Sequence, residues 1–299
     1  MKEYLHSFMQ KCAYPAAAQA QILADSEKVQ NNQRFMQLVA AFYTEPICSV
    51  QEFQAELDEI SKQEGVNGYT LYLIFFLFLS KDLRKEYQKA DLAEDIYWDT
   101  VADLVCKLLE CFEVEKVWGI TAFSWFEGIF HMRTIALGRM QYCLGKFGEP
   151  DATVAGHKVS AEDTVVYIHI PSSKKPFDRE NRIASYEKAY LFYKDRFADQ
   201  TPIFCCDSWL LNPEMRTVLG ESSNIVSFMD DFKLVKSYGY TDNRNMWRIF
   251  GADADKLPSE LPRNTSMQRK IADWLQEGNR LGAGKGLFVY DPTHRTTLK

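Results

Sequence analysis

The segment from Thr164 to Leu211 constrains the fold of this chain more than any other, because it reads as strand, helix and strand in succession. The first strand is an unbroken apolar run, Thr164–Ile170, and the second apolar run extends from Pro202 to Leu211. Between them, apolar and aromatic side chains recur at helical spacing from about Asp178 to Phe197. Such a crossover joins parallel strands that are covered on both faces, which explains why neither strand alternates. We therefore predict two buried parallel strands.

The chain before residue 116 carries only helical patterns. Apolar residues recur at helical spacing in Phe35–Phe42 and again in Val101–Phe112. The longest apolar run, Tyr69–Leu79, is far shorter than the roughly 20 residues that cross a bilayer, so it reads as a buried helix. We predict a bundle of four or five helices over residues 1–115, which serves packing or partner contact.

Residues 116–299 are richer in Gly, Pro and β-branched residues, and their apolar periods are shorter. Capping boxes at two places, Ser49 with Glu52 and Thr265 with Gln268, predict helix starts. Beyond the central unit we predict a long strand from about Arg133 to Phe147, a helix over Glu214–Leu219, a strand over Asn224–Phe232, a helix from Ser266 to about Glu277, and a turn at Gly282–Gly286 before a last strand, Leu287–Tyr290.

The composition is that of an ordinary globular protein, with 46% hydrophobic and 25% charged residues. The net charge of -6 argues against a nucleic-acid surface and against a polybasic membrane patch. The first residues lack the basic-then-apolar layout of a signal peptide. The seven cysteines form no CxxC pair, so we expect no metal site and reduced thiols in a cytoplasmic protein.

Short segments of the second half occur in a recognisable order. They are Trp118-Gly119, Phe130-His131-Met132-Arg133, Arg139-Met140-Gln141, Ile168-His169-Ile170-Pro171-Ser172, Ser208-Trp209-Leu210-Leu211, Ser223-Asn224-Ile225, Leu261-Pro262, Thr265 and Gln268-Arg269. Together they resemble a family of bacterial acyltransferase-domain proteins, which pair a helical N-terminal domain with a C-terminal domain of the GNAT N-acyltransferase type. The resemblance implies an α+β fold: a helical bundle over 1–115, then a GNAT-like mixed β-sheet domain flanked by helices over 116–299.

The resemblance also implies an acyl-coenzyme A co-substrate. In the GNAT fold the two central strands splay apart, here Thr164–Ile170 and Ile203–Leu211, and the gap receives the pantetheine arm. The N-terminus of the crossover helix then receives the pyrophosphate through its free amides and dipole. Family members usually carry a glycine-containing loop at this point, and this chain has none. The expected cofactor-binding residues are Ile170, Ser172, Ser173, Lys174 and Lys175, with side chains in place of the usual glycines.

Three polar residues interrupt the two apolar strands. His169 is a candidate general base for an amine, because its ordinary pKa lies near neutrality. The alternative is a buried histidine held by a backbone carbonyl. Ser208 could protonate the thiolate leaving group and Asp207 could orient His169, although adjacent strand residues face opposite ways. Taken singly, each of the two is read first as a structural residue.

Four further residues are candidates for binding the acceptor. Glu127 and His131 are four residues apart, so on a helix they would share a face that could hold an amine, or form a surface ion pair. Arg139 and Gln141 alternate with apolar residues along the predicted strand, so they could line a polar cleft or face solvent.

The sequence therefore predicts a GNAT-type N-acyltransferase that transfers an acyl group from acyl-coenzyme A to a small amine. The first alternative is a non-catalytic ligand-binding or regulatory module on the same scaffold, suggested by the glycine-free loop. The second is a cysteine hydrolase or transferase that uses Cys205 or Cys206 with His169. Mid-strand cysteines are poor nucleophiles, which disfavours that reading.

Overall fold

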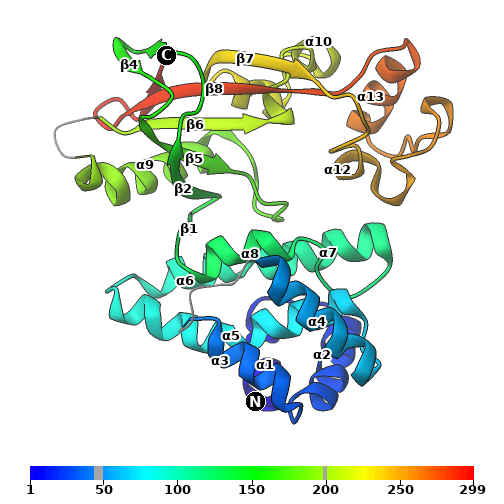
Figure 1. Cartoon of the computed structure of the whole chain (residues 1–299). Coiled ribbons are helices and arrows are strands. Elements are labelled where there is room, and N and C mark those ends of the chain that lie inside the picture. Colours follow the sequence, from blue (N-terminus) through cyan, green and yellow to red (C-terminus); the bar gives the residue numbers. More distant parts are fainter. Residues whose placement is uncertain (44–49, 198–200) are drawn as a thin grey trace. The chain divides into compact units, whose positions relative to one another are not determined.

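The computed structural model describes residues 1–43, 50–197 and 201–299. It divides into two compact units, Met1–Ile135 and Ala136–Lys299. Each unit is described by itself below, with the element labels of Figure 1.

In the described residues of unit 1 the regular structure is helical as far as Phe130, and only the first two residues of strand β1 follow. Its helices are α1 (Lys2–Lys11), α2 (Ala16–Val29), α3 (Gln33–Ala41), α4 (Val50–Glu64), α5 (Gly68–Lys89), α6 (Glu94–Val101), α7 (Asp103–Glu115) and α8 (Phe123–Phe130). The number of four or five helices predicted over residues 1–115 was too low, because seven, α1–α7, lie in the described residues of that range; the short helix α6 was not separated from α7. The helix start predicted at Ser49 lies outside the described residues.

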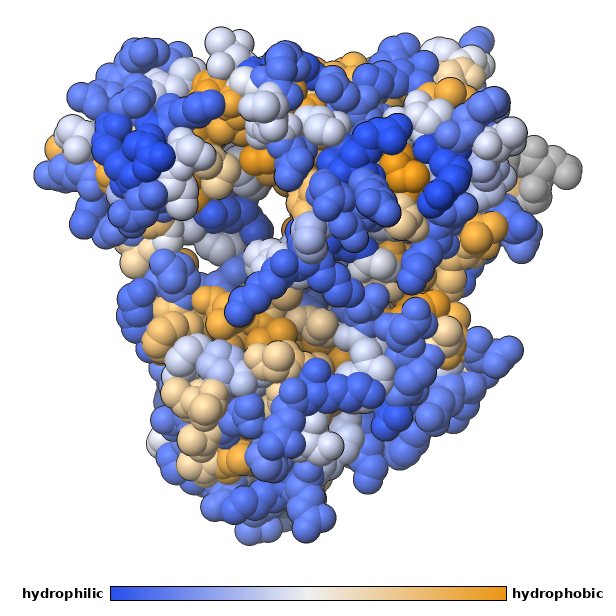
Figure 2. Space-filling model, turned by 180° about the vertical axis from the view of Figure 1, so that it is seen from behind, coloured by the Kyte–Doolittle hydropathy of each residue, from blue (hydrophilic) through white to orange (hydrophobic). Residues whose placement is uncertain are grey.

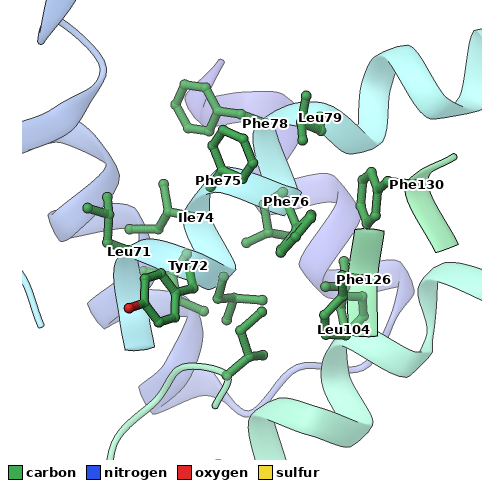
Figure 3. Close-up of a cluster of buried hydrophobic side chains, with 14 of the residues drawn as sticks. Leu71, Tyr72, Ile74, Phe75, Phe76, Phe78, Leu79, Leu104, Phe126 and Phe130 are labelled. Carbon is green, nitrogen blue, oxygen red and sulfur yellow. The ribbon is translucent and has the colours of Figure 1, made fainter. Parts of the chain in front are cut away.

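Helix α5 is the centre of unit 1, as Figure 3 shows. Every residue from Thr70 to Ser80 is buried, so this stretch is apolar on all sides rather than on one stripe. The ring of Phe76 lies 5.0 Å from that of Phe123, 5.2 Å from Phe126 and 4.9 Å from Phe130, measured between centroids. Packing of this kind contributes about 0.5–1.5 kcal/mol per aromatic pair beyond area burial.

This packing also moves the boundary between the units. The sequence prediction placed the division between residues 115 and 116, whereas the structure places it after Ile135. The physical reason is α8, whose buried aromatic side chains belong to the same core as α5. The change in composition at Trp118 therefore marks a change of local pattern within unit 1.

Unit 2 is built on a seven-stranded sheet in the order β1-β2-β5-β6-β8-β7, with β9 paired to β8, and a separate hairpin of β3 and β4. Its strands are β1 (Thr134–Leu137), which begins in unit 1, β2 (Met140–Lys146), β3 (Ala152–Val154), β4 (His157–Val159), β5 (Thr164–His169), β6 (Ile203–Ser208), β7 (Lys233–Gly239), β8 (Gly282–Asp291) and β9 (Thr296–Leu298). Its helices are α9 (Arg179–Tyr193), α10 (Met215–Leu219), α11 (Asn224–Met229), α12 (Trp247–Phe250) and α13 (Ser266–Gln276), with 3-10 turns at Lys194–Arg196, Trp209–Leu211, Gly251–Asp253 and Pro258–Glu260.

The central strand–helix–strand unit is confirmed: β5 and β6 are parallel, and α9 connects them. In Figure 1, α9 lies along one side of the sheet, while α12 and α13 gather near one end of β8. The predicted helix at Ser266 is also confirmed, because Thr265 and Gln268 form a complete capping box.

Three predicted elements of unit 2 were wrong. The long strand from Arg133 to Phe147 is two strands, β1 and β2, because Gly138 has a φ of +83° and turns the chain between them. The strand predicted over Asn224–Phe232 is helix α11, which Ser223 caps by accepting a bond from the amide of Ile225. The segment is so short that its pattern of apolar residues is compatible with a helix as well as with a strand.

The third correction concerns the glycine-rich segment, predicted as a turn. Gly282, Gly284 and Gly286 lie inside β8, which pairs with β6 and β7 on its two edges. A Cβ atom at Gly284 would collide with the carbonyl oxygen of Leu211, and one at Gly286 would lie 2.8 Å from the Cβ of Phe232. Glycine is required here because neighbouring backbone and side chains cross the strand closely.

Within the described ranges, α-helices of the length and apolarity needed to cross a bilayer are absent. On the face drawn in Figure 2, hydrophilic residues cover most of the surface and hydrophobic residues form smaller areas.

Candidate active site

The two central strands separate at their C-terminal ends. β5 and β6 pair only through Val166 with Phe204 and Tyr167 with Cys205. Beyond these pairs β5 remains bonded to β2 as far as His169, and β6 remains bonded to β8 as far as Ser208. The facing edges of the last residues of β5 and β6 are therefore open to an extended chain, which can pair with such backbone groups as an added strand would. This confirms the predicted splay.

Successive side chains of a strand point to opposite faces of the sheet, and this rule assigns His169, Asp207 and Ser208 to faces. Phe204 stacks on Phe288, and Tyr186 of α9 packs on the same ring, so this face of the sheet lies under α9. By alternation, Ser208 lies on the α9 face, whereas His169 and Asp207 lie together on the opposite face. Of the two neighbours Asp207 and Ser208, only Asp207 shares a face with His169.

His169 is half-buried at the end of β5. Its Nε2 atom lies 3.3 Å from the Sγ atom of Cys143 on β2, so a thiol and an imidazole share a hydrogen bond whose donor depends on the histidine tautomer. Gln141 is the direct cross-strand partner of His169 in the β2–β5 register. Cys143, Gln141 and His169 therefore form one polar group on the face opposite α9.

Asp207 and Ser208 both have local partners. The exposed Asp207 carboxylate accepts a hydrogen bond from the Tyr238 hydroxyl of β7 at 2.7 Å. Burial, and then the neighbouring Asp207 carboxylate, raise the pKa of Tyr238, so the phenol remains a donor. The Ser208 hydroxyl accepts from the amide of Leu210 at 3.2 Å and caps the 3-10 turn that follows β6.

Arg139, predicted to line a cleft, lies in the turn between β1 and β2 and holds the loop that follows β5. Its Nε atom donates to the carbonyl oxygen of Lys175 and its NH1 atom to that of Pro171, both at 3.0 Å. Its guanidinium also lies 5.1 Å from the centroid of the Phe177 ring. Arg139 is only 8% exposed, so these contacts replace solvent and fix the shape of the loop.

A second arginine, Arg182 of α9, holds the other end of the same loop. It is fully buried and donates to Asp231 at 2.7 Å, to Ser227 at 2.9 Å and to the carbonyl of Phe177 at 3.3 Å. Tyr186 also donates to Asp231, so the same oxygen atom, Oδ2, accepts from both Arg182 and Tyr186. The sequence prediction missed Arg182, although its position on the buried face of α9, one turn before Tyr186, could have identified it.

The loop itself presents the predicted cofactor-binding residues. Ser172, Lys174 and Lys175 are exposed, while Ile170 and Ser173 are half-buried. The Oγ atom of Ser173 is buried and has no hydrogen-bond partner among the described residues. With its carbonyls turned toward the arginines, the loop offers a serine hydroxyl and two lysines to an anion.

One feature of the loop opposes an anion. Asp178 caps α9: its carboxylate accepts the amide of Asn181 at 2.9 Å, and that bond lowers the pKa of the Asp178 carboxyl. The helix N-terminus predicted to receive a pyrophosphate thus already holds a carboxylate.

Glu127 lies on α8 in unit 1, and His131 is the C-cap residue that follows the last turn of that helix. The Nδ1 atom of His131 lies 3.6 Å from the Glu127 carboxylate and 2.9 Å from the Glu127 carbonyl oxygen. Glu127 also forms an ion pair with Arg133, and the His131 ring packs 4.7 Å from that of Phe42. The two side chains are in contact, and the ion pair that Glu127 forms within unit 1 is with Arg133.

The two strand cysteines are poor nucleophiles. Cys205 and Cys206 have no exposed surface, and burial raises the pKa of Cys205 to about 12 and that of Cys206 well above its ordinary value. Their thiols are therefore protonated at neutral pH, which argues against the cysteine-nucleophile alternative. No group of three or more His, Cys, Asp or Glu side chains suited to a metal ion occurs in residues 1–43, 50–197 and 201–299.

Comparison with known families agrees with this geometry. The GNAT-like C-terminal domain matches residues 134–288, and the N-acyltransferase N-terminal domain matches residues 3–132. The chain therefore belongs to the family of proteins with a GNAT-like C-terminal domain preceded by an N-acyltransferase N-terminal domain.

Solved structures show the same fold. An acyltransferase in complex with decanoyl-coenzyme A and teicoplanin is 15% identical, with a TM-score of 0.73, over 95% of this chain and 86% of that one. The acyltransferase in complex with decanoyl-coenzyme A alone is 17% identical, with a TM-score of 0.71, over 94% of this chain and 86% of that one. A mutant acyltransferase in complex with octanoyl-coenzyme A is 15% identical, with a TM-score of 0.73, over 95% of this chain and 87% of that one. No curated protein sequence matches the chain significantly.

Proposed function

We propose that this protein is an acyl-coenzyme A-dependent N-acyltransferase acting on an amine. The observation that carries the proposal is the open edge between β5 and β6, where pairing ends after Tyr167 and Cys205. The pantetheine arm carries two amides, and it would pair with backbone groups along that edge, where β5 and β6 do not pair with each other. The structural neighbours, which share the fold, are acyltransferases in complex with coenzyme A or its decanoyl and octanoyl thioesters.

The loop after β5 would hold the phosphates. Ile170 contributes backbone, Ser172 and Ser173 contribute hydroxyls, and Lys174 and Lys175 contribute positive charge. The buried, unpartnered Oγ atom of Ser173 supports an anion at this point, because a buried hydroxyl without a partner is unfavourable.

His169 is the proposed general base. It takes the proton from the attacking amine, the new C–N bond forms as the thioester C–S bond breaks, and the thiolate takes a proton on leaving. Cys143 fixes the ring through Nε2. Ser208 is the proposed proton source for the thiolate, and Asp207 is proposed to orient His169. Their partners in the structure, the Leu210 amide for Ser208 and Tyr238 for Asp207, support a structural role for each.

The acceptor is proposed as an amine of small size, with Arg139 and Gln141 as the proposed contacts in unit 2; the binding of an amine by Glu127 and His131 concerns unit 1 and stays a separate prediction. The contacts of Arg139 support holding the loop instead, and those of Glu127 support an ion pair within unit 1. Two structural neighbours carry teicoplanin or its acylated form, so a larger amine is the natural extension of the same proposal.

A second candidate is a binding module without turnover. The observation that favours it is the Asp178 carboxylate at the N-terminus of α9, together with a loop that has no glycine. An ionised carboxylate at the phosphate position repels coenzyme A. On this reading the scaffold binds a different ligand, and no thiol is released from any thioester.

The two candidates are separated by one paired experiment. Thermal unfolding is measured with coenzyme A and with acetyl, octanoyl and decanoyl thioesters, and free thiol is measured with a panel of amines. A ligand that binds only the folded state raises the melting temperature by mass action. We expect a shift that the Lys174→Ala and Lys175→Ala double variant removes and that the control Lys158→Ala, an exposed lysine on β4, retains.

The chemical step is tested with His169→Ala, against His157→Ala on the exposed hairpin as the control. Release of thiol that depends on an amine and on His169 supports the enzyme. A thermal shift with no thiol release from any donor supports the binding module. No shift and no release with any thioester would contradict the acyl-coenzyme A proposal itself.

A further inference from the structure

Gln141 holds an unused hydrogen-bond donor beside the proposed base. Its side chain is only 2% exposed, yet its Nε2 atom has no hydrogen-bond partner among the described residues. Most buried amide groups in folded proteins are paired, since a buried donor without an acceptor is unfavourable. A donor kept in this state is explained if a bound molecule supplies the acceptor atom.

The register fixes what this donor can reach. Gln141 pairs directly with His169, so the two side chains lie on the same face at neighbouring positions. Gln141 is on β2, whereas the open edge lies between β5 and β6, on the far side of β5. The Gln141 amide therefore lies away from the edge between β5 and β6, where acyl-coenzyme A is proposed to bind. It lies next to His169, the residue proposed to take the proton of the amine.

The other polar groups nearby do not satisfy this amide. Cys143, two residues along β2, directs its sulfur to the Nε2 atom of His169. Arg139, two residues before, directs its guanidinium to the loop carbonyls of Pro171 and Lys175. Among Arg139 of the turn and Gln141 and Cys143 of β2, only the Gln141 side chain has a buried nitrogen without a partner in the described residues.

We propose that Gln141 is a specificity-determining residue, whose side-chain amide binds an oxygen atom that the acceptor carries next to its amino nitrogen. The acceptor class is then an amine with a vicinal hydroxyl or carbonyl, such as an amino alcohol, an amino sugar or an amino-acid amide. The inference rests on the proposed function, because it places the amine at His169. A neutral amide suits a neutral oxygen, and it distinguishes such an amine from an alkylamine of the same size.

The test compares matched amines on the wild-type protein and on Gln141→Met, which keeps the side-chain length and removes the amide. The pairs are 2-aminoethanol against propylamine, glucosamine against cyclohexylamine, and glycinamide against butylamine. We expect the oxygen-bearing member to have the higher kcat/KM by roughly 10-fold to 100-fold in the wild type, the size expected of one buried hydrogen bond. In Gln141→Met the two members become equal, and binding measured by thermal shift follows the same pattern.

Stability provides an independent readout. If the amide serves a ligand, Gln141→Met leaves the unliganded protein as stable as the wild type or more stable, since it removes an unpaired buried donor. The matched control is Gln268→Met, where the amide donates to the carbonyl of Ile249 at 2.9 Å and its oxygen caps α13, so stability falls. Loss of stability in Gln141→Met comparable to that control would show a structural role and overturn the proposal.

The outcomes separate the two proposals. Turnover without preference for the oxygen, or a preference that Gln141→Met retains, overturns the role of Gln141 and leaves the acyltransferase intact. Absence of turnover with every amine contradicts the proposed function, and the role of Gln141 then stands or falls on the binding difference between matched amines.

Discussion

Replacing Arg139 by Met tests whether this arginine holds the loop after β5 or contacts the substrate. In the structure its guanidinium makes two hydrogen bonds of 3.0 Å to loop carbonyls, those of Pro171 and Lys175, and lies over the Phe177 ring. Methionine preserves the buried stem and removes all three contacts. Because none of them involves a ligand, the unliganded protein should already be affected.

The magnitude follows from these contacts. Hydrogen bonds to a charged group contribute roughly 1.5–3 kcal/mol each, and a partly desolvated cation–π contact contributes about 1 kcal/mol. The loss is reduced because the loop carbonyls can turn to water, so we expect the free energy of unfolding to fall by about 3 kcal/mol. In a unit of this size that lowers the melting temperature by about 6–12 °C.

The assay is thermal unfolding without ligand, followed by coenzyme A titration. The control is Arg179→Met, which removes an exposed arginine from the first turn of α9, the helix that follows the loop, and should change stability little. We expect Arg139→Met to lose both stability and coenzyme A affinity, since an unfixed loop must be ordered on binding. An unchanged melting temperature combined with a raised KM for the amine alone would refute the loop-holding role and restore Arg139 to the acceptor site.

Three further predictions concern the site and its frame. Asp178→Asn keeps the cap of α9 but removes its negative charge, so coenzyme A should bind more tightly while the stability of the protein changes little. Binding is measured by titration, and weaker binding by the variant would show that the carboxylate assists the ligand. Gly284→Ala places a Cβ atom against the Leu211 carbonyl, so the free energy of unfolding, measured by chemical denaturation, should fall by about 3 kcal/mol or more. The control is Gly239→Ala, which should be nearly neutral because a Cβ atom there would have no neighbour within 4 Å. Burial raises the pKa of Cys205 to about 12, so this thiol should resist alkylation at pH 8 until the protein unfolds. Alkylation is followed by mass spectrometry, and rapid labelling of Cys205 in the native protein would contradict its burial.

The sequence by itself determined the central unit and the class of fold. The apolar runs at the centres of β5 and β6 predict burial on both faces there, and the helix between them makes the strands parallel. The cap at Thr265 was equally readable, because a capping box is a contact between residues three apart. The continuous burial of α5 followed from a run with no polar face.

Only the tertiary structure decided what the polar residues do. Arg139 looked like a cleft residue, and its partners are carbonyls more than 30 positions away. Asp207 accepts from Tyr238 on another strand, and Gln141 meets His169 through strand register rather than through sequence spacing. The glycines of β8 were misread as a turn for the same reason, since what excludes a side chain there comes from other elements. Local pattern fixes which residues are buried, whereas the partner of a buried polar group depends on elements brought together from distant parts of the chain.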